Sequence, residues 1–336
     1  MPAIKLNGTD TIWTCSEDDT VMRAALRAGH GFPYECNVGA CGNCRFELVE
    51  GQVEHLRADP PGWSERDRQR NRYLGCQARP LSDCVVKLRL SPHYASKVAP
   101  RQSDAVLIGT RDITHDIREF RFRTETPANF APGQYALLEI PEVEGARAYS
   151  MANLANEDGL WDFQIRRVAD GAATTKLFNG LEVGATVRLD GPYGNAYLRA
   201  NAERDIVCLA GGSGLAPMIS IARGVARAPG LARRRLDFIY GGRDAMDICG
   251  KDMLQQLPGF GETLHYHPVV SALPAGEDGW NGYRGFVHEI AHQLFADRLA
   301  TCEIYFAGPP LMGQAVQKML AELRVPAGQI HFDQFY

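Results

Sequence analysis

At 336 residues, the chain is long enough for two or three domains of ordinary size. Hydrophobic residues make up 45% of it and charged residues 23%, which excludes a disordered or fibrous protein, and the net charge of −4 argues against nucleic acid or an anionic membrane as the main partner. No stretch has the roughly 18 apolar residues of a membrane span and the N-terminus does not resemble a signal peptide, so we expect a cytoplasmic protein.

Residues 1–97 are predicted to form a small domain of short strands around one helix. Asn7-Gly8 is a hairpin signal between two alternating runs, and residues 19–29 have the features of a capped helix that ends at Gly29. The strands are expected at residues 4–6, 11–14, 45–49 and 85–90. Residues 91–103 contain two prolines and scattered polar side chains, so we expect a linker there.

Two further domains are predicted. Residues 101–200 contain turn-rich strands with few helical periods, which favours a small antiparallel barrel. Residues 201–336 alternate strands with helices, which is typical of a parallel, helix-flanked sheet. The barrel strands are expected at residues 105–110, 117–123, 135–140, 161–167 and 186–189. The parallel strands are expected at residues 206–210, 236–240, 264–270 and 303–307, with a helix at 312–323.

Nine cysteines are unevenly placed, and five of them lie between residues 36 and 84. An odd number in a chain without an export signal argues against a disulfide framework. Cys36, Cys41 and Cys44 have the spacing C-x4-C-x2-C and Cys76 follows, which is the pattern of plant-type [2Fe–2S] ligation. Zinc is the alternative, although four-cysteine zinc sites more often come as two close pairs. Unrelated core cysteines would have to place three thiols in nine residues by chance.

The middle segment contains Arg147-Ala148-Tyr149-Ser150 after an expected strand and turn. An arginine that can make two hydrogen bonds to a phosphate could hold a flavin nucleotide together with a neighbouring aromatic ring and hydroxyl. Gly171 and Thr174 are expected in a turn before a helix, whose N-terminus would suit a second phosphate. Taken alone, each of these motifs could equally be structural.

The last segment has a glycine-rich run at residues 211–217, Gly-Gly-Ser-Gly-Leu-Ala-Pro, between an expected strand and a helix. Glycines allow the backbone to approach a pyrophosphate, and the helix N-terminus favours its charge. Two further strand ends, at residues 240–243 and 306–310, would lie at the same carboxyl edge of the sheet, where ligands bind in such folds. A tight turn without a ligand is the alternative.

This combination of motifs resembles the ferredoxin–NAD(P)+ reductase superfamily over nearly the whole chain. More narrowly, it resembles the reductase components of bacterial multicomponent oxygenases, and residues 32–37, 189–194 and 330–335 are similar to toluene and alkene diiron monooxygenase reductases. The resemblance implies a multidomain protein with α+β and α/β parts. These are a β-grasp plant-type ferredoxin at 1–97, an antiparallel β-barrel for FAD at 101–200, and a Rossmann-like parallel-sheet domain for NAD(H) at 201–336.

The resemblance also assigns roles to individual residues. The cluster ligands are Cys36, Cys41, Cys44 and Cys76. Among the flavin contacts, Arg147 would bind a phosphate, Tyr149 would lie against the ring, and Ser150 would lie near the nitrogen that receives hydride. The remaining nucleotide contacts would be Gly171 and Thr174 for the second flavin phosphate, and Gly211, Gly212, Gly214, Pro217 and Gly308 for the nicotinamide nucleotide.

The chain end has an assigned role as well. Phe335, or less favourably Tyr336, would shield the flavin face that the nicotinamide must reach. Tyr149, Ser150 and Phe335 are therefore the expected catalytic residues.

Two positions depart from the family pattern. Asp170 precedes Gly171, where many relatives have two glycines, and a carboxylate beside a pyrophosphate is unfavourable unless it points away. The family strand usually ends in Cys-Gly-Pro, with the cysteine near the nicotinamide, whereas this one ends in Ala307-Gly308-Pro309. Cys302 does not replace that thiol, because five residues along a strand reverse the face.

Electron counting connects the three modules. NADH gives up two electrons as hydride, a [2Fe–2S] cluster accepts one at a time, and a flavin between them can do both. The resemblance therefore implies an oxidoreductase that passes electrons from NADH through FAD and the cluster to a Rieske ferredoxin, or to the hydroxylase of a soluble diiron hydrocarbon monooxygenase. NADH is expected rather than NADPH, because Arg243 is accompanied by Asp244 and Asp247.

Two alternatives remain open. A reductase with the same cofactors could serve a Rieske aromatic ring-hydroxylating dioxygenase. Alternatively, the chain could be a redox-sensing flavoprotein that holds its cofactors without turnover. We expect a monomer that has no nucleic-acid or membrane partner.

Overall fold

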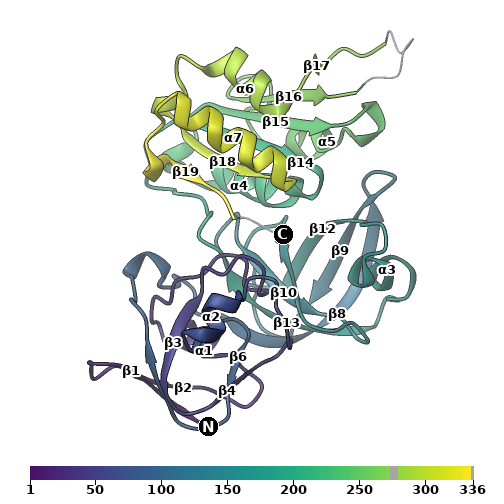
Figure 1. The fold of residues 1–336 in the computed structure, drawn as a ribbon. Coiled ribbons are helices and arrows are strands. Elements are labelled where there is room, and N and C mark those ends of the chain that lie inside the picture. The colour runs from purple at the N-terminus through teal and green to yellow at the C-terminus, as the bar shows by residue number, and fades with distance from the viewer. Residues whose placement is uncertain (273–278, 334–336) are drawn as a thin grey trace.

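The computed structural model describes residues 1–272 and 279–333 of the chain. The chain forms three main sheets in succession, and in the view of Figure 1 the third lies above the other two. One sheet falls in each of the expected ranges 1–97, 101–200 and 201–336. The limits of these ranges stay predictions. In the described part of the chain, no helix is long and apolar enough to cross a membrane.

The first domain is built from short strands and two helices. Its elements are β1 (Ala3–Leu6), β2 (Ile12–Thr14), α1 (Val21–Arg27), β3 (Arg45–Glu50), β4 (Val53–His55), α2 (Glu65–Gln69), β5 (Arg72–Leu74), β6 (Ala78–Pro80) and β7 (Cys84–Lys87). Five strands form a sheet in the order β2-β1-β7-β3-β5, in which only β1 and β7 are parallel. This mixed sheet with a packed helix is the expected β-grasp arrangement.

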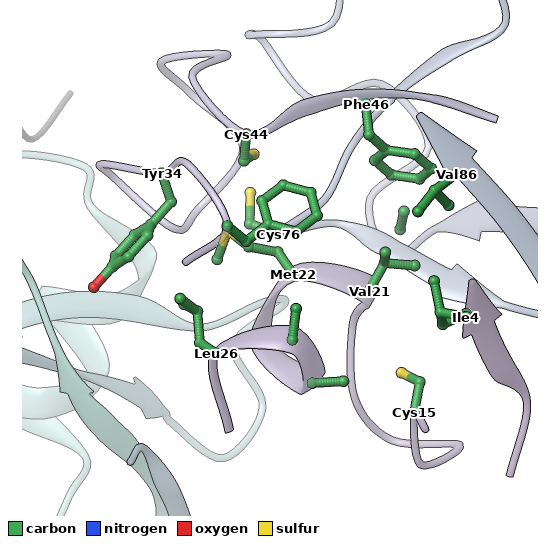
Figure 2. Close-up of a cluster of buried hydrophobic side chains, with 14 of the residues drawn as sticks. Ile4, Cys15, Val21, Met22, Leu26, Tyr34, Cys44, Phe46, Cys76 and Val86 are labelled. Atoms are coloured by element: carbon green, nitrogen blue, oxygen red, sulfur yellow. The ribbon is translucent and has the colours of Figure 1, made fainter. Parts of the chain in front are cut away.

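Helix α1 forms because its start is capped and its side chains are buried. The Thr20 side chain accepts a hydrogen bond from the backbone N–H of Arg23, which satisfies one of the donors that a helix start leaves free. Residues 21–26 are all buried, and all but Arg23 are apolar. The helix packs in the first hydrophobic core beside Cys44 and Cys76 (Figure 2).

The expected linker at residues 91–103 is shorter and better packed than predicted. Pro92–Tyr94 form a 3-10 turn, and strand β8 (Arg101–Asp112) already begins inside the predicted linker. The Tyr94 ring packs on Tyr34, with 6.1 Å between the ring centroids. The prediction failed here because prolines mark the absence of a strand but do not exclude aromatic packing.

The second domain is an antiparallel sheet of six strands. Besides β8, its elements are β9 (Ile117–Arg123), β10 (Tyr135–Glu139), β11 (Arg147–Ser150), β12 (Leu160–Arg166), α3 (Ala172–Asn179) and β13 (Thr186–Tyr193). The strand order is β11-β10-β13-β8-β9-β12. An antiparallel bridge between Met151 and Phe163 brings the two edge strands together, so the sheet curves into the expected barrel.

The third domain is a parallel sheet with helices on both faces. Its elements are β14 (Ile206–Gly211), α4 (Leu215–Arg227), β15 (Leu236–Gly242), α5 (Lys251–Gln255), β16 (Leu264–Val270), β17 (Tyr283–Arg284), α6 (Val287–Phe295), β18 (Glu303–Ala307), α7 (Pro310–Glu322) and β19 (Ile330–His331). The strand order is β17-β16-β15-β14-β18-β19.

Alternate residues of β14 face opposite layers of this domain. Cys208 and Ala210 belong to the core under α4 and α5, whereas Val207 and Leu209 belong to the core under α6 and α7. The sheet is therefore covered on both faces, as predicted for a Rossmann-like domain. Its carboxyl edge, where β14, β15 and β18 end, is left for a ligand.

Candidate cofactor sites

The structure brings the four predicted cluster ligands together. Cys36, Cys41 and Cys44 lie on the loop between α1 and β3, and Cys76 lies between β5 and β6. Three of the thiols are buried, whereas Cys41 is partly exposed. The loop therefore has one side that faces solvent.

The four thiols are arranged as two pairs. The Cys41 N–H donates to the Cys36 sulfur over 3.3 Å, and the thiols of Cys36 and Cys41 are hydrogen-bonded to each other. Cys44 is hydrogen-bonded to Cys76 in the same way. The hydrogen bond from Cys41 lowers the pKa of Cys36 to about 5, whereas the same bond and burial raise the pKa of Cys41.

This pairing fits two irons better than one zinc ion. Around a single tetrahedral ion with bonds of about 2.3 Å, the sulfurs would all lie about 3.8 Å apart. Within residues 1–272 and 279–333, no three cysteine sulfurs lie within 4.8 Å of one another. One pair of thiolates for each iron agrees with the donor set of a [2Fe–2S] cluster.

An arginine that the sequence analysis did not single out braces the cluster loop. Arg45 donates to the carbonyls of Gly42 and Gly62 over 2.7 Å each, and its Nε donates to Asp67 over 2.9 Å. The bridge ties the cysteine loop to the segment that starts α2. Only the tertiary structure reveals it, because the partners are 3, 17 and 22 residues away.

Arg147 is an oriented cation on strand β11. Its Nη1 donates to the carbonyls of Glu144, Gly145 and Ala146 over 3.1, 3.0 and 3.2 Å. Among the residues that the structure describes, no carboxylate lies within ion-pair distance of it. A fixed guanidinium without a protein counter-charge fits a phosphate.

Tyr149 and Ser150 follow on the same strand. Tyr149 packs on the barrel core, and burial raises the pKa of its phenol to about 12. Ser150 is the register partner of Tyr135 on β10, and the Tyr135 hydroxyl donates to the Glu35 carbonyl over 2.6 Å. The predicted flavin strand β11 thus pairs with β10, and β10 contacts the residue before Cys36 through the Tyr135 hydroxyl.

The predicted phosphate turn at Gly171 and Thr174 needs one correction. Thr174 lies inside α3 and not before it, since Gly171 is the residue that precedes the helix. The Thr174 hydroxyl accepts from the N–H of Val168 over 3.1 Å, so it closes the turn itself. Asp170 is exposed and has a left-handed backbone (φ 58°), a conformation that glycine adopts without strain.

A cavity of about 490 Å³ lies at the carboxyl ends of β14 and β15, between the barrel and the third sheet. Gly211 and Gly212 line it, and their predicted role in a nucleotide loop stays a prediction. Arg166 of the barrel also lines the cavity, and its Nε donates to Asp116 over 2.6 Å. Further lining comes from Arg243, Asp247, Phe286, Leu311 and Met312.

The other predicted nucleotide residues lie outside this cavity. Gly214 allows a close approach, because a Cβ there would lie 2.0 Å from the carbonyl oxygen of Ala307. Pro217 is buried in α4. Gly308 lines a smaller hollow together with Ala307, Phe332 and Asp333. Cys302 lies buried before the start of β18, at the end of the strand opposite Ala307.

The end of the described chain contacts the barrel. The Asn195 N–H donates to Asp333 over 3.2 Å, and burial raises the pKa of the Asp333 carboxyl to about 7. Phe332 stacks on Phe306 with 4.6 Å between the ring centroids. The predicted catalytic residue Phe335 and its alternative Tyr336 lie outside the described residues, so their role stays a prediction.

Three family models cover most of the chain. A 2Fe-2S iron-sulfur cluster binding domain matches residues 4–81, an oxidoreductase FAD-binding domain matches 104–197, and an oxidoreductase NAD-binding domain matches 208–318. These matches define an iron–sulfur flavoprotein oxidoreductase that binds a [2Fe–2S] cluster, FAD and NAD. An enzyme is therefore supported over the redox-sensing alternative.

Full-length relatives narrow the assignment. The ferredoxin–NAD(P)+ reductase CarAd of Metapseudomonas resinovorans is 38% identical over 96% of both chains. The ferredoxin–NAD+ reductase component of the alkene monooxygenase system of Xanthobacter autotrophicus is 36% identical over 96% of this chain and 97% of its own. A solved ferredoxin reductase in carbazole 1,9a-dioxygenase has a TM-score of 0.91 at 36% identity, covering 100% of this chain and 98% of that one. The chain belongs to the family of ferredoxin–NAD(P)+ reductase components of oxygenase systems.

Proposed function

We propose that the protein passes electrons from NADH through FAD and its [2Fe–2S] cluster to a Rieske-type ferredoxin, or directly to the hydroxylase of a soluble diiron hydrocarbon monooxygenase. The contact between Tyr135 and Glu35 carries this proposal, because it holds the cysteine loop against the strand pair with the flavin motif. The cavity of the third domain is lined on its barrel side by Ile117 of β9 and Arg166 of β12. In this proposal the flavin site lies between the cysteine loop and the NAD cavity.

The cofactors supply the change from two-electron to one-electron transfer. The protein positions them. Arg147 would hold a flavin phosphate, Tyr149 would pack on the ring, and Ser150 would offer a hydroxyl at the end of β11 that pairs with Tyr135. Cys36 with Cys41, and Cys44 with Cys76, each hold one iron.

We propose NADH rather than NADPH because Asp247 places a carboxylate in the cavity. Its oxygen accepts from the N–H groups of Arg243 and Asp244 over 2.8 and 3.4 Å, which fixes it just after β15. An acidic residue after the second strand of such a sheet binds the ribose hydroxyl of NAD and repels the extra phosphate of NADP.

The electron acceptor would approach the exposed side of the cysteine loop. Cys41 is the partly exposed ligand, and the neighbouring Asn43 is exposed. We also propose a monomer in the cytoplasm with domains at 1–97, 101–200 and 201–336. A reducing compartment agrees with nine cysteines that are all free in the structure.

A reductase of a Rieske aromatic ring-hydroxylating dioxygenase is the second candidate. It is favoured by the likeness to the ferredoxin reductase in carbazole 1,9a-dioxygenase.

Three experiments test these proposals. Absorption and paramagnetic-resonance spectra of the purified protein, before and after NADH, should show bleaching of the flavin and a reduced [2Fe–2S] signal. Absence of NADH-driven cytochrome c reduction with both cofactors bound would contradict the first proposal. Reconstitution with diiron and Rieske oxygenase components separates the two candidates by which one turns over.

A further inference from the structure

A buried arginine reaches the cluster loop from helix α1. Arg23 is only 4% exposed, and Asn37, directly after Cys36, is 1% exposed. Arg23 Nε donates to Asn37 Oδ1 over 3.0 Å, and Arg23 Nη2 donates to the Asn37 backbone carbonyl over 3.1 Å. The arginine therefore holds both the side chain and the backbone of one loop residue.

This contact fixes which way the Asn37 amide is turned. Arginine has five N–H donors and no acceptor, so the amide atom that faces Arg23 Nε must be the oxygen. The amide nitrogen, Nδ2, is then directed away from Arg23. In the part of the chain that the structure describes, this buried Nδ2 has no hydrogen-bond partner.

A buried donor without a partner is destabilising and rare in native proteins. The surroundings of Asn37 indicate what its partner is. The N–H groups of the next residues, Val38, Ala40 and Cys41, are hydrogen-bonded to the Cys36 sulfur. Arg23 itself interacts electrostatically with Cys76. Asn37 is thus adjacent to a ligand of one cysteine pair, and its partner Arg23 is within electrostatic range of a ligand of the other pair.

The acidic groups that act on Arg23 are hydrogen-bonded to other residues. Asp190 and Asp19 are carboxylates that act on it electrostatically. Both carboxylates, however, accept hydrogen bonds from Arg27. Tyr193 acts on Arg23 as well, and its hydroxyl donates to Asp190 over 2.9 Å. No carboxylate among the described residues forms an ion pair with Arg23 at 4.0 Å or less.

We propose that Asn37 Nδ2 donates a hydrogen bond to a sulfur of the [2Fe–2S] cluster, and that Arg23 is the positioning residue that holds the amide for it. Hydrogen bonds to cluster sulfurs stabilise the more negative, reduced state and so raise the reduction potential. The pair therefore adjusts how readily the cluster accepts an electron from flavin. This inference rests on the proposed function, because it requires the cluster at Cys36, Cys41, Cys44 and Cys76.

The decisive variant is Asn37→Gly, since glycine accepts the left-handed backbone of this position (φ 56°). Asn71→Gly is the matched control. Asn71 has the same backbone conformation (φ 51°), but it is exposed and its Nδ2 already donates to the Leu48 carbonyl. Both holoproteins are titrated under paramagnetic-resonance detection after their iron and sulfide contents are shown to match the wild type.

At a fixed ambient potential, Asn37→Gly should lower the ratio of reduced to oxidised cluster about tenfold, which is about 59 mV for a one-electron couple. Asn71→Gly should not change it. Arg23→Lys keeps the charge but loses the fork, so it should lower the ratio in the same direction. In the double variant the two decreases in this ratio should not add, because both substitutions remove the same hydrogen bond from Asn37 Nδ2.

A wild-type protein without iron would contradict the proposed function and leave no cluster to adjust. A wild-type cluster whose potential is unchanged in Asn37→Gly would overturn the present inference alone. If Asn37→Gly fails to retain its cluster, Arg23→Lys decides: an unchanged potential overturns the inference, and a lowered one supports it.

Discussion

Arg27 on helix α1 forms a two-pronged ion pair with Asp190 on strand β13, 163 residues away in the sequence. Its Nη1 and Nη2 lie 2.9 and 2.8 Å from the two carboxylate oxygens. The pair joins the ferredoxin domain to the barrel, and the hydrophobic core of the ferredoxin domain continues across the same junction to Tyr135, Leu137 and Tyr193. The cysteine loop is therefore held against the flavin domain.

Asp190→Asn should weaken this junction. Removing one partner of a buried ion pair costs about 3–5 kcal/mol, and Asp190 is almost fully buried. We expect a lower unfolding temperature of the ferredoxin domain and slower reduction of the cluster after NADH in a stopped-flow experiment. Flavin reduction should stay fast.

The control for this prediction is Arg188→Ala. Arg188 pairs with Asp18 across the same junction, but the two side chains are 38% and 52% exposed, so the loss should be about 1 kcal/mol or less. Equal effects of the two variants would show that the junction does not depend on the buried pair.

Cys44→Ser should abolish the visible absorption of the cluster and electron transfer to protein acceptors. Flavin should still reduce ferricyanide with NADH, because Arg147 and the NAD cavity are on other domains. Cys15→Ser is the control, since this buried thiol lies outside the cysteine loop and donates to its neighbour's carbonyl as a serine would. A Cys44→Ser protein with normal transfer to its natural acceptor would contradict the cluster assignment.

The sequence predicted sites whose chemistry lies in residue type and spacing. The cysteine spacing identified four thiols that the structure brings together, and the glycine-rich run identified Gly211 and Gly212 at the cavity. Both signals are local, because few residue types provide thiolates or a close backbone approach.

Contacts between distant residues were not predicted. No local motif marks Arg23 in the sequence, and an arginine in a helix is ordinarily predicted to face solvent. Tyr135 and Glu35 are 100 residues apart, so only packing brings them together. Thr174 was predicted to lie before the helix, whereas it lies in the first turn of α3. The helix start was missed because Gly171, which precedes it, has no capping side chain.

Asp247→Asn should weaken the preference for NADH. The amide oxygen can still accept from the N–H of Arg243, but the negative charge that opposes the extra phosphate is lost. We expect the ratio of kcat/KM for NADPH to that for NADH to rise about tenfold, which corresponds to about 1.4 kcal/mol. Asp252 is exposed on α5, so Asp252→Asn is the control and should leave the ratio unchanged. An unchanged ratio in Asp247→Asn would place the ribose elsewhere.

Asp333 should make the stability of the C-terminal attachment depend on pH. The pKa of its carboxyl is raised to about 7, mainly by burial and also by the charge of Glu35, although hydrogen bonds from the backbone of Asn195 and Ala196 and the charge of Arg199 act in the opposite direction. Tyr34 and Tyr135 also face this carboxyl.

Between about pH 4 and pH 7 the unfolded chain releases the proton of Asp333 while the folded chain keeps it. The contribution of Asp333 to the free energy of unfolding therefore falls across this interval, by up to about 4 kcal/mol, and is level above it. Asp333→Asn keeps an acceptor for Asn195 and removes the titration. Its unfolding temperature should be close to that of the wild type at pH 5 and above it at pH 8. The exposed Asp10→Asn should show no such difference, and a gap between Asp333→Asn and the wild type that is the same at both pH values would contradict the prediction.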